Sequence, residues 1–405
     1  MDLRLTDVLS GRRRSLGPRA DRSVDLYVCG PTVYAPAHVG HGRTLLVFDV
    51  ARRSLEAEGV RVRHAMNVTD LEDKIDRRAQ ELGTSSRALA RAEERAFYRD
   101  LRALGNLRPT YGPRASEFVP QMIDVARALA RTGRVERQGD EWRYEAPARP
   151  PGRSFPSGDE LARHAVAEPG HPFPATGEGG RSFAVWKRQE APLPSWPSPW
   201  GRGVPGWHLQ CYAMASRLLA VPLDLHGGGR DLAYPHHFAE NEIALALRKR
   251  PFARCFVHTG LVLQDGSKMS KSVGNLVALR PALARFGAGG LRWYLLGRPY
   301  AERFPWEDRE ARAAADELVR VRRTLRAWLV RDGGSPVRAR DAERLLADSR
   351  RALADGLATD KVVGAVRRFS ARLARAPGEG IPRGERTRGR QAVQGIAQRL
   401  GVSLA

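Results

Sequence analysis

Residues 27–43 read YVCGPTVYAPAHVGHGR and place a cysteine and two histidines close together. Residues 25–29 have strand composition, a Gly-Pro turn follows, and residues 44–55 have the apolar spacing of a helix. In such a strand–turn–helix unit the amino terminus of the helix favours anions such as phosphates. His38 and His41 fall where the helix begins, which predicts half of an active site. A pair of histidines at this spacing is also common on ordinary surfaces, so the rest of the chain must decide.

The composition is strongly basic. The chain has 405 residues, a net charge of +23 and only six lysines, so arginine supplies nearly all of the positive charge. Such an excess predicts a polyanionic partner, most simply nucleic acid. An arginine-rich genome would produce the same bias without any such partner.

The cysteine count and the hydropathy indicate the cellular compartment of the protein. Cys29, Cys211 and Cys255 are odd in number and far apart, which argues against a disulfide framework and favours a reducing cytoplasm. The N-terminal residues have no signal-peptide pattern, and no stretch reaches the apolar length of a membrane span. We therefore expect a soluble cytoplasmic protein of two or three domains.

A second chemistry-bearing block covers residues 206–248. It contains GWHLQC, then LDLHGGGRDLAYPHH, then FAENEIALALRKR. A short strand ending in Gly227, Gly228 and Gly229 lets a backbone approach a nucleotide closely, although a run of glycines alone is a weak signal. Glu240 follows His236 by four residues, so on a helix both could face one metal ion or simply form a helix N-terminal pair.

A third block is KMSKS at residues 268–272, after an apolar strand pattern and an Asp-Gly turn. Lys268 and Lys271, flanked by small hydroxylic residues, suit a mobile clamp on phosphates. In most proteins such a pair would be a solvated loop.

The remaining pattern is mixed. Residues 60–68 alternate like a strand and run into the acidic NVTDLEDKI, which is either functional or a helix start capped by Thr69. Residues 85–134 have helical repeats, residues 135–146 a hairpin pattern, and residues 147–181 an irregular, proline-rich composition. From residue 281 onward the spacing is helical throughout, which predicts a bundle with a basic surface.

HVGH and KMSKS together form the paired signature of class I aminoacyl-tRNA synthetases. More narrowly, CGPTVYAPAHVGHGRT, NVTDLEDKI, PSWPSPWGRGVPGWHLQC, LDLHGGGRDLAYPHH and DGSKMSKSVGN resemble the cysteinyl-tRNA synthetases, in that order, over residues 25–370. The resemblance implies an α/β fold with a Rossmann-like parallel sheet split by an insertion. The expected parts are residues 1–115 and 201–300 for the catalytic domain, 116–200 for the insertion, and 301–405 for a tRNA-contacting helical bundle.

The resemblance also implies a reaction. Cysteine and ATP, with Mg²⁺, would give cysteinyl-adenylate, and the terminal adenosine of tRNA(Cys) would then accept the cysteinyl group. His38, His41, the three glycines, Lys268 and Lys271 would bind ATP, and the histidines and lysines would stabilise the transferring phosphates. We expect a monomer.

One zinc ion per chain belongs to the family's amino-acid pocket. The resemblance places its ligands on Cys29, Cys211, His236 and Glu240, and a thiolate-selecting zinc would make proofreading unnecessary. If the chain carried a two-residue insertion after the histidine pair, the fourth ligand would instead be Glu242. The residues implied for the rest of the pocket are Thr69, Trp207, His208 and Asp231.

Two alternatives remain open. The chain stops shortly after the helical region, so the family's anticodon-reading module is expected to be missing. The cysteine ligase of the mycothiol pathway resembles the same core, lacks that module, and transfers cysteine to the amine of a glucosaminyl-inositol. A silent, tRNA-binding paralogue is the second alternative, and the intact motifs argue against it.

Overall fold

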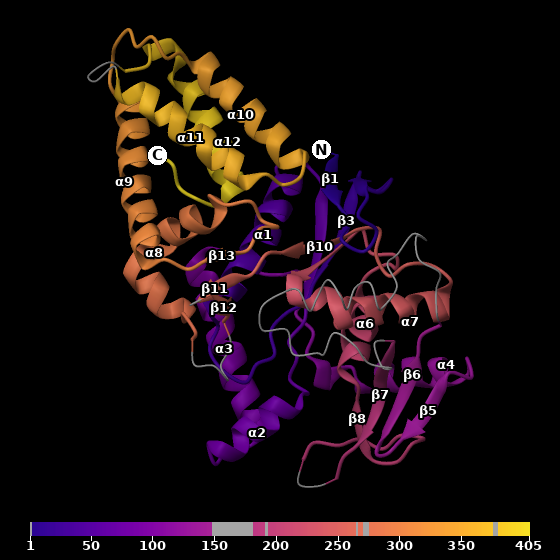
Figure 1. Ribbon diagram of the computed structural model, residues 1–405. Helices are drawn as coiled ribbons and strands as arrows, with labels where there is room; N and C mark the ends of the chain where they lie inside the picture. Colours follow the sequence, from indigo (N-terminus) through magenta and orange to yellow (C-terminus); the bar gives the residue numbers. More distant parts are fainter. Residues whose placement is uncertain (1, 148–180, 191–192, 265, 270–274, 376–379) are drawn as a thin grey trace.

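The computed structural model describes residues 2–147, 181–190, 193–264, 266–269, 275–375 and 380–405 (Figure 1). At its centre lies a four-stranded sheet whose strands are all parallel. In spatial order they are β10 (Phe256–Thr259), β9 (Leu225–Gly229), β3 (Ser23–Val28) and β4 (Arg61–Met66). Parallel strands aligned in register bring their carboxyl ends to one edge, where open α/β sheets bind ligands. The predicted parallel α/β sheet is confirmed.

The crossover between β3 and β4 is α1 (Val39–Glu56), which packs on the sheet. The helix starts five residues earlier than the apolar spacing predicts, because His38 caps it: its ring nitrogen accepts from Gly40 N at 3.1 Å. His41 Nδ1 accepts in return from His38 N at 3.3 Å. The histidine pair therefore satisfies two backbone donors at the amino terminus of α1.

The first half of the chain continues with α2 (Asp73–Glu81) and α3 (Ser86–Leu104). The helical repeats predicted within residues 85–134 form two separate helices. Gly105 ends α3 in the left-handed conformation at φ 87°, and α4 (Val119–Ala130) begins only after an irregular segment. Glycine is the residue that tolerates this conformation at a helix end.

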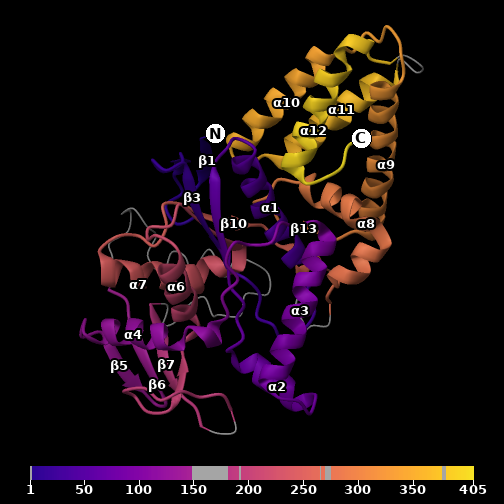
Figure 2. The ribbon, with the colours of Figure 1, turned by 180° about the vertical axis from the view of Figure 1, so that it is seen from behind.

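An antiparallel sheet follows, made of β5 (Val135–Gln138), β6 (Glu141–Glu145), β7 (Ser182–Arg188) and β8 (Gly203–Pro205). The predicted hairpin over residues 135–146 is its first pair of strands. The irregular segment predicted at residues 147–181 falls almost entirely outside the described residues. In Figure 2 this insertion sheet lies at the end of the molecule opposite the helical bundle.

The chain then returns to the parallel sheet with α6 (Trp207–Leu218), β9 and α7 (Phe238–Arg248). The three glycines end β9, as predicted, and each is paired with a residue of β10. Packing requires Gly227 at its position, because a Cβ there would lie 2.2 Å from the Phe48 ring of α1. This glycine lets α1 approach the sheet.

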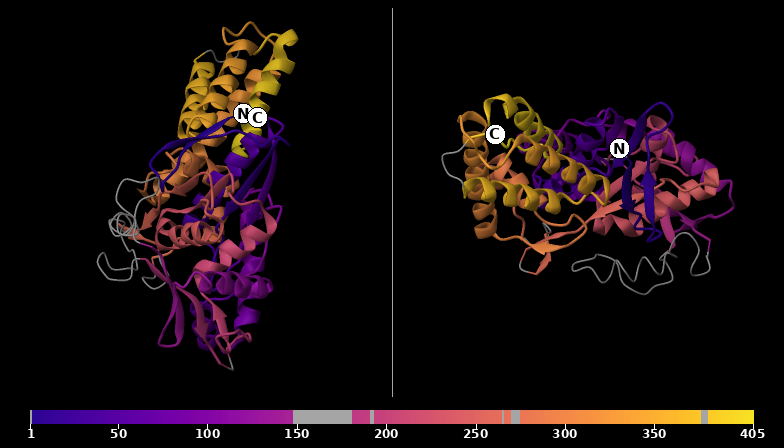
Figure 3. Two further views of the ribbon diagram at one scale, coloured as in Figure 1. Left: turned by 90° about the vertical axis from the view of Figure 1, so that its right-hand side faces the viewer. Right: turned by 90° about the horizontal axis from the view of Figure 1, so that it is seen from above.

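The remaining strands are short: β11 (Val262–Gln264), β12 (Ser267–Lys268) and β13 (Phe304–Pro305) form one small sheet, and β1 (Leu3–Thr6) pairs with β2 (Arg13–Leu16). The chain then forms α8 (Leu279–Leu296), α9 (Asp308–Val330), α10 (Ala339–Ala354), α11 (Thr359–Ala374) and α12 (Arg386–Leu400). Figure 3 shows α9–α12 as a bundle at one end of the molecule. This confirms the predicted helical region.

Buried polar contacts join the bundle to the helix that covers the parallel sheet. Arg292 of α8, which is 1% exposed, donates to Asp49 of α1 at 2.7 Å and to the carbonyl of Leu400 at 2.7 Å. A buried charge of this kind is tolerated because it is paired and hydrogen-bonded. No helix among the described residues is long and apolar enough to cross a membrane.

Candidate active site and metal centre

Four side chains that are far apart in the sequence meet at the carboxyl edge of the parallel sheet. Cys29 directly follows β3, Cys211 lies on α6, His236 lies in the turn before α7, and Glu240 lies in the first turn of α7. One donor atom from each lies within 4.8 Å of the others. All four are at most 8% exposed. The structure thus brings together the four predicted metal ligands.

The geometry of this Cys29–Cys211–His236–Glu240 cluster fits a tetrahedral metal ion. Two thiolates bound to one zinc ion at about 2.3 Å have sulfur atoms about 3.8 Å apart. The two Sγ atoms lie 3.8 Å apart. Glu240 Oε1 is buried without a hydrogen-bond partner among the described residues and lies 3.6 Å from His236 Nε2. A soft thiolate pair with one imidazole and one carboxylate is a donor set that zinc favours.

The pKa shifts of three residues of the cluster also favour a bound cation. Burial, followed by the neighbouring Cys211, raises the pKa of the Cys29 thiol, and burial raises the pKa of the Glu240 carboxyl. Burial also lowers the pKa of the His236 imidazole well below its usual value. Each of these three shifts disfavours the charged form of its group, and a divalent cation is what would stabilise the thiolate and carboxylate forms here.

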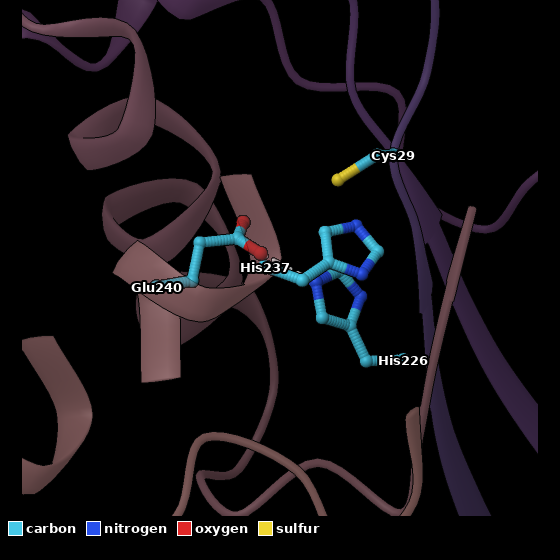
Figure 4. Close-up of side chains that lie close together, drawn as sticks. All are labelled: Cys29, His226, His237 and Glu240. Atoms are coloured by element: carbon cyan, nitrogen blue, oxygen red, sulfur yellow. Dashed lines mark hydrogen bonds and ion pairs between the residues drawn. The ribbon is translucent and has the colours of Figure 1, made fainter. Parts of the chain in front are cut away.

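A second set of donors shares two members of the cluster. Cys29, His226, His237 and Glu240 also have donor atoms within 4.8 Å of one another (Figure 4). Both ring nitrogens of His226 are engaged, with Tyr27 O at 3.1 Å and Glu240 Oε2 at 2.7 Å. His226 therefore orients Glu240 from the side, as second-shell residues do, and the set containing Cys211 and His236 is the better metal site.

The sequence interpretation missed His226, His237 and His258. His237 Nδ1 lies 2.8 Å from His258 Nε2, and the rings of His226 and His237 stack with centroids 4.1 Å apart. The available signal was a histidine inside an apolar strand pattern, LDLHGGG for His226 and CFVHTG for His258. A polar ring in a buried strand requires hydrogen-bond partners, and for these histidines the partners lie on other elements.

Two of the predicted pocket residues surround His236. The Trp207 ring stacks on the His236 ring with centroids 4.4 Å apart, and His208 Nδ1 lies 3.0 Å from His236 Nδ1. The contact with His208 leaves His236 Nε2 on the side of Glu240. A cavity of about 340 Å³ adjoins Trp207 and His208 and is lined by carboxylates of residues 70–76, among them Asp70 and Glu72.

The other predicted pocket residues lie at the same edge. Thr69 follows β4 and is 2% exposed. Asp231 follows β9 and is half-buried, and a Cβ on Gly229 would lie 2.6 Å from its carboxylate. Glu242 is buried on α7 but belongs to neither donor set among the described residues.

The predicted phosphate-binding residues are placed in part. The rings of His38 and His41 lie with centroids 3.9 Å apart at the amino terminus of α1, and both are partly exposed. Lys268 ends β12, which pairs with β11, while Lys271 lies outside the described residues. A Cβ at position 228 would lie 3.0 Å from the His237 ring, so the absence of a side chain at Gly228 leaves room for that ring.

Comparison with known proteins identifies a matching family and several relatives. Residues 16–316 match the family described as tRNA synthetases class I (C) catalytic domain. The chain is 39% identical over 378 residues to the cysteine--tRNA ligase of Anaeromyxobacter sp. (strain K), which covers 90% of this chain and 76% of the relative. It is 37% identical over 338 residues to that of Thermococcus onnurineus, covering 80% and 68%.

Solved structures show the same fold at low sequence identity. Agrobacterium radiobacter LeuRS, in a ternary complex with tRNA, superposes with a TM-score of 0.65 at 12% identity and covers 95% of this chain and 84% of its own. Mycobacterium tuberculosis methionyl-tRNA synthetase bound by methionyl-adenylate superposes with a TM-score of 0.63 at 17% identity and covers 93% and 90%.

Proposed function

Because the chain belongs to the family of class I (C) tRNA synthetases, we propose that it is a cysteine--tRNA ligase that joins L-cysteine to tRNA(Cys) with ATP. The observation that carries the proposal is the buried Cys29–Cys211–His236–Glu240 cluster, with sulfur atoms 3.8 Å apart, at the carboxyl edge of the parallel sheet. A site that binds a thiolate distinguishes cysteine from serine, which has a hydroxyl, and from methionine, whose thioether cannot ionise. The reaction places the enzyme in the cytoplasm, where tRNA is charged.

The reaction has two steps. In the first, a carboxylate oxygen of cysteine attacks the α-phosphorus of Mg²⁺-bound ATP, and pyrophosphate leaves. In the second, a ribose hydroxyl of the terminal adenosine of the tRNA attacks the carbonyl carbon of cysteinyl-adenylate, and AMP leaves. No covalent enzyme intermediate is needed, so the residues act by position and charge.

The residues at the amino terminus of α1 would bind the phosphates. His38 and His41 lie together there, where the helix favours negative charge. Lys268 and Lys271 would stabilise the charge that develops between the α- and β-phosphates as pyrophosphate leaves. Asp231, at the end of β9, would hold the ammonium group of cysteine.

The four-residue cluster would hold one zinc ion, which when bound supplies a soft cation that prefers a thiolate to a hydroxyl. Glu240 rather than Glu242 would be the fourth ligand, because only Glu240 belongs to the donor set. Trp207 and His208 would enclose the substrate side chain and fix the orientation of His236. No observation on the described residues favours a sugar-amine acceptor.

The test combines pyrophosphate exchange with an acceptor assay. Purified protein should contain about one zinc per chain and catalyse ATP–pyrophosphate exchange with cysteine but not serine. It should then charge purified tRNA(Cys) and leave a glucosaminyl-inositol unmodified. Exchange that is equal with serine and cysteine, or a cysteinylated sugar without charged tRNA, would overturn the proposal.

A further inference from the structure

The chain that follows KMSKS is fixed beside the histidine pair of HVGH. Residues 277–279 run antiparallel to residues 37–39, and His38 lies opposite Ala278. Backbone hydrogen bonds of 3.0 and 2.8 Å join the two segments on either side of this pair. The segment after KMSKS is therefore attached directly to the start of α1.

The chain that leads into KMSKS belongs to the small sheet of β11, β12 and β13. The backbone of Lys268, in β12, pairs with Leu263 of β11, and β11 pairs in parallel with β13. The contact continues beyond the strands, since Gly260 N donates to Tyr300 O at 2.8 Å. A Cβ on Gly260 would lie 2.2 Å from backbone atoms of the same segment, residues 299–305. The position of the Lys268 backbone therefore depends on where residues 299–305 lie.

Arg43 joins that segment to α1. It lies two residues after His41, is 1% exposed and donates to the backbone carbonyls of Leu295 and, at 2.6 Å, Pro299. Its guanidinium also lies over the Phe304 ring of β13, 4.9 Å from the ring centroid. One side chain thus attaches both the end of α8 and the start of β13 to the helix that carries the histidine pair.

The chemistry of arginine suits this position. Leu295 lies in the last turn of α8, where carbonyls have no partner within the helix and a positive charge is favoured. A planar guanidinium can donate to two acceptors at once, which an ammonium group does less well. Burial, followed by the neighbouring Arg298, lowers the pKa of Arg43 to about 10, so the side chain is still charged at neutral pH.

We propose that Arg43 is a positioning residue that fixes the sheet of β11, β12 and β13 relative to the histidine pair at the start of α1. The inference rests on the proposed function, in which HVGH and KMSKS act on the phosphates of one ATP molecule, and it names the side chain that aligns the two motifs. Groups that stabilise one transition state must be accurately placed, because a misplacement of about 1 Å can cost about 100-fold in rate.

The first test is Arg43→Met, which removes the charge and both hydrogen bonds but keeps much of the volume. The kcat of cysteine-dependent ATP–pyrophosphate exchange should fall by about 10- to 100-fold. The KM for cysteine should stay at the wild-type value, because the site that binds the thiol is unchanged. Zinc bound per chain reports the folded fraction, so a partly unfolded preparation is not mistaken for a catalytic loss.

A double-mutant cycle with Lys268→Ala separates positioning from a general structural effect. A lysine that is absent cannot be misplaced, so the loss of kcat in the double variant should be smaller than the product of the single losses by at least about 5-fold. Arg292→Met is the matched control, because Arg292 is equally buried and joins α8 to α1 through Asp49. It should lower the melting temperature, and any loss of kcat should multiply with that of Lys268→Ala.

Arg43→Lys supplies a second variant that keeps the charge, should the methionine variant fail to fold. Its kcat should lie between those of wild type and Arg43→Met, and its loss should again overlap with that of Lys268→Ala. Wild-type kcat in folded Arg43→Met, or losses that multiply fully in either Arg43 cycle, would overturn the proposal. Wild-type protein without cysteine-dependent exchange would instead remove the proposed function itself, which separates the two failures.

Discussion

The Cys29–Cys211–His236–Glu240 cluster, or metal-competent cluster, buries polar side chains, whereas the helical bundle buries mainly apolar ones. In the cluster, the residues withdrawn from water carry sulfur, nitrogen and oxygen, and Glu240 is 0% exposed. In α9–α12 most buried side chains are apolar, such as Trp328 and Phe369, while arginines occupy the surface. Burial of apolar area stabilises the bundle, whereas burial of unpaired polar groups costs free energy in the cluster.

This difference predicts whether a substitution in each region should affect the activity or the stability of the protein. A change in the cluster removes chemistry and costs little stability, because the native groups are themselves poorly accommodated without a cation. A change in the core of the bundle removes stability and leaves the donor set untouched.

The largest expected effect is that of Glu240→Gln. An amide is a poor zinc ligand, so the zinc content should fall well below one per chain and cysteine-dependent exchange should fall by about 100-fold or more. Metal-free protein should be as stable as wild type, because a buried carboxyl group has been replaced by a neutral isostere. The measurements are zinc analysis, exchange kinetics and thermal melting in chelator.

Glu242→Gln is the matched control, since Glu242 lies two residues after Glu240 on α7 and is also buried. It should keep its zinc. Loss of zinc from Glu242→Gln together with retention in Glu240→Gln would reverse the assignment of the fourth ligand.

The bundle should respond in the opposite way to Trp328→Ala. Trp328 is 2% exposed, packs on Phe369 with ring centroids 5.6 Å apart, and donates from Nε1 to the carbonyl of Val337 at 3.1 Å. Its removal should lower the free energy of unfolding by about 3–5 kcal/mol. The KM for cysteine at 25 °C should stay at the wild-type value in the folded protein.

Denaturant melts and exchange kinetics check both statements. Val319→Ala on α9 is the control, because Val319 is 62% exposed and its truncation should change stability by less than about 0.5 kcal/mol. A Trp328→Ala protein that melts normally but loses cysteine affinity would contradict the separation of the two regions.

His64 tests whether burial of a polar ring is by itself a sign of function. It lies on β4, 7% exposed, and both ring nitrogens lack partners among the described residues. Burial lowers the pKa of His64 to about 3, against about 6.5 in an unfolded chain. Between these values only the unfolded chain binds the proton, so the free energy of unfolding falls as the pH drops below about 6.5.

At pH 5 this loss amounts to about 2 kcal/mol, and His64→Phe should remove it. The variant should therefore lose less stability than wild type between pH 7 and pH 5, with zinc content and cysteine exchange at pH 7 unchanged. Equal pH dependence in the two proteins, or lost exchange in the variant, would show that His64 is not the inert buried ring described here.

The four members of the cluster were predicted through the resemblance to the cysteinyl-tRNA synthetases. The residues alone indicated only the pair of His236 and Glu240, whose spacing of four holds even though His236 lies in the turn before α7. The parallel sheet was likewise implied by the resemblance, whereas the helical bundle followed from periodicity. Spacing and periodicity are local, and local pattern is what a single sequence carries.

What the sequence could not predict depends on contacts between distant segments. In the sequence, the glycines of β9 resemble a nucleotide-binding loop. In the structure, the Phe48 ring of α1 occupies the space where a side chain at position 227 would lie. In the sequence, His226 is one residue of an apolar strand pattern. Its contact with Glu240 Oε2, at 2.7 Å, is seen only in the structure. The Asn67 amide is seen to join two segments only when Gly30 N and Thr69 Oγ1 lie within hydrogen-bond distance of it.

The smallest expected effect lies on the surface of the bundle. Arg320, Arg323 and Arg326 of α9 are exposed at helical spacing and have no ion-pair partner among the described residues. Changing all three to glutamine should raise the KM for tRNA by about 3- to 10-fold and reduce the slope of log affinity against log salt by about 2 to 3. Cysteine exchange without tRNA should not change, because these side chains contribute only to long-range attraction of the polyanion. The triple lysine variant keeps the charge and should retain the salt slope. If the glutamine variant also retained it, the excess of arginine would have no part in binding nucleic acid through this helix, and the bundle would contribute stability alone.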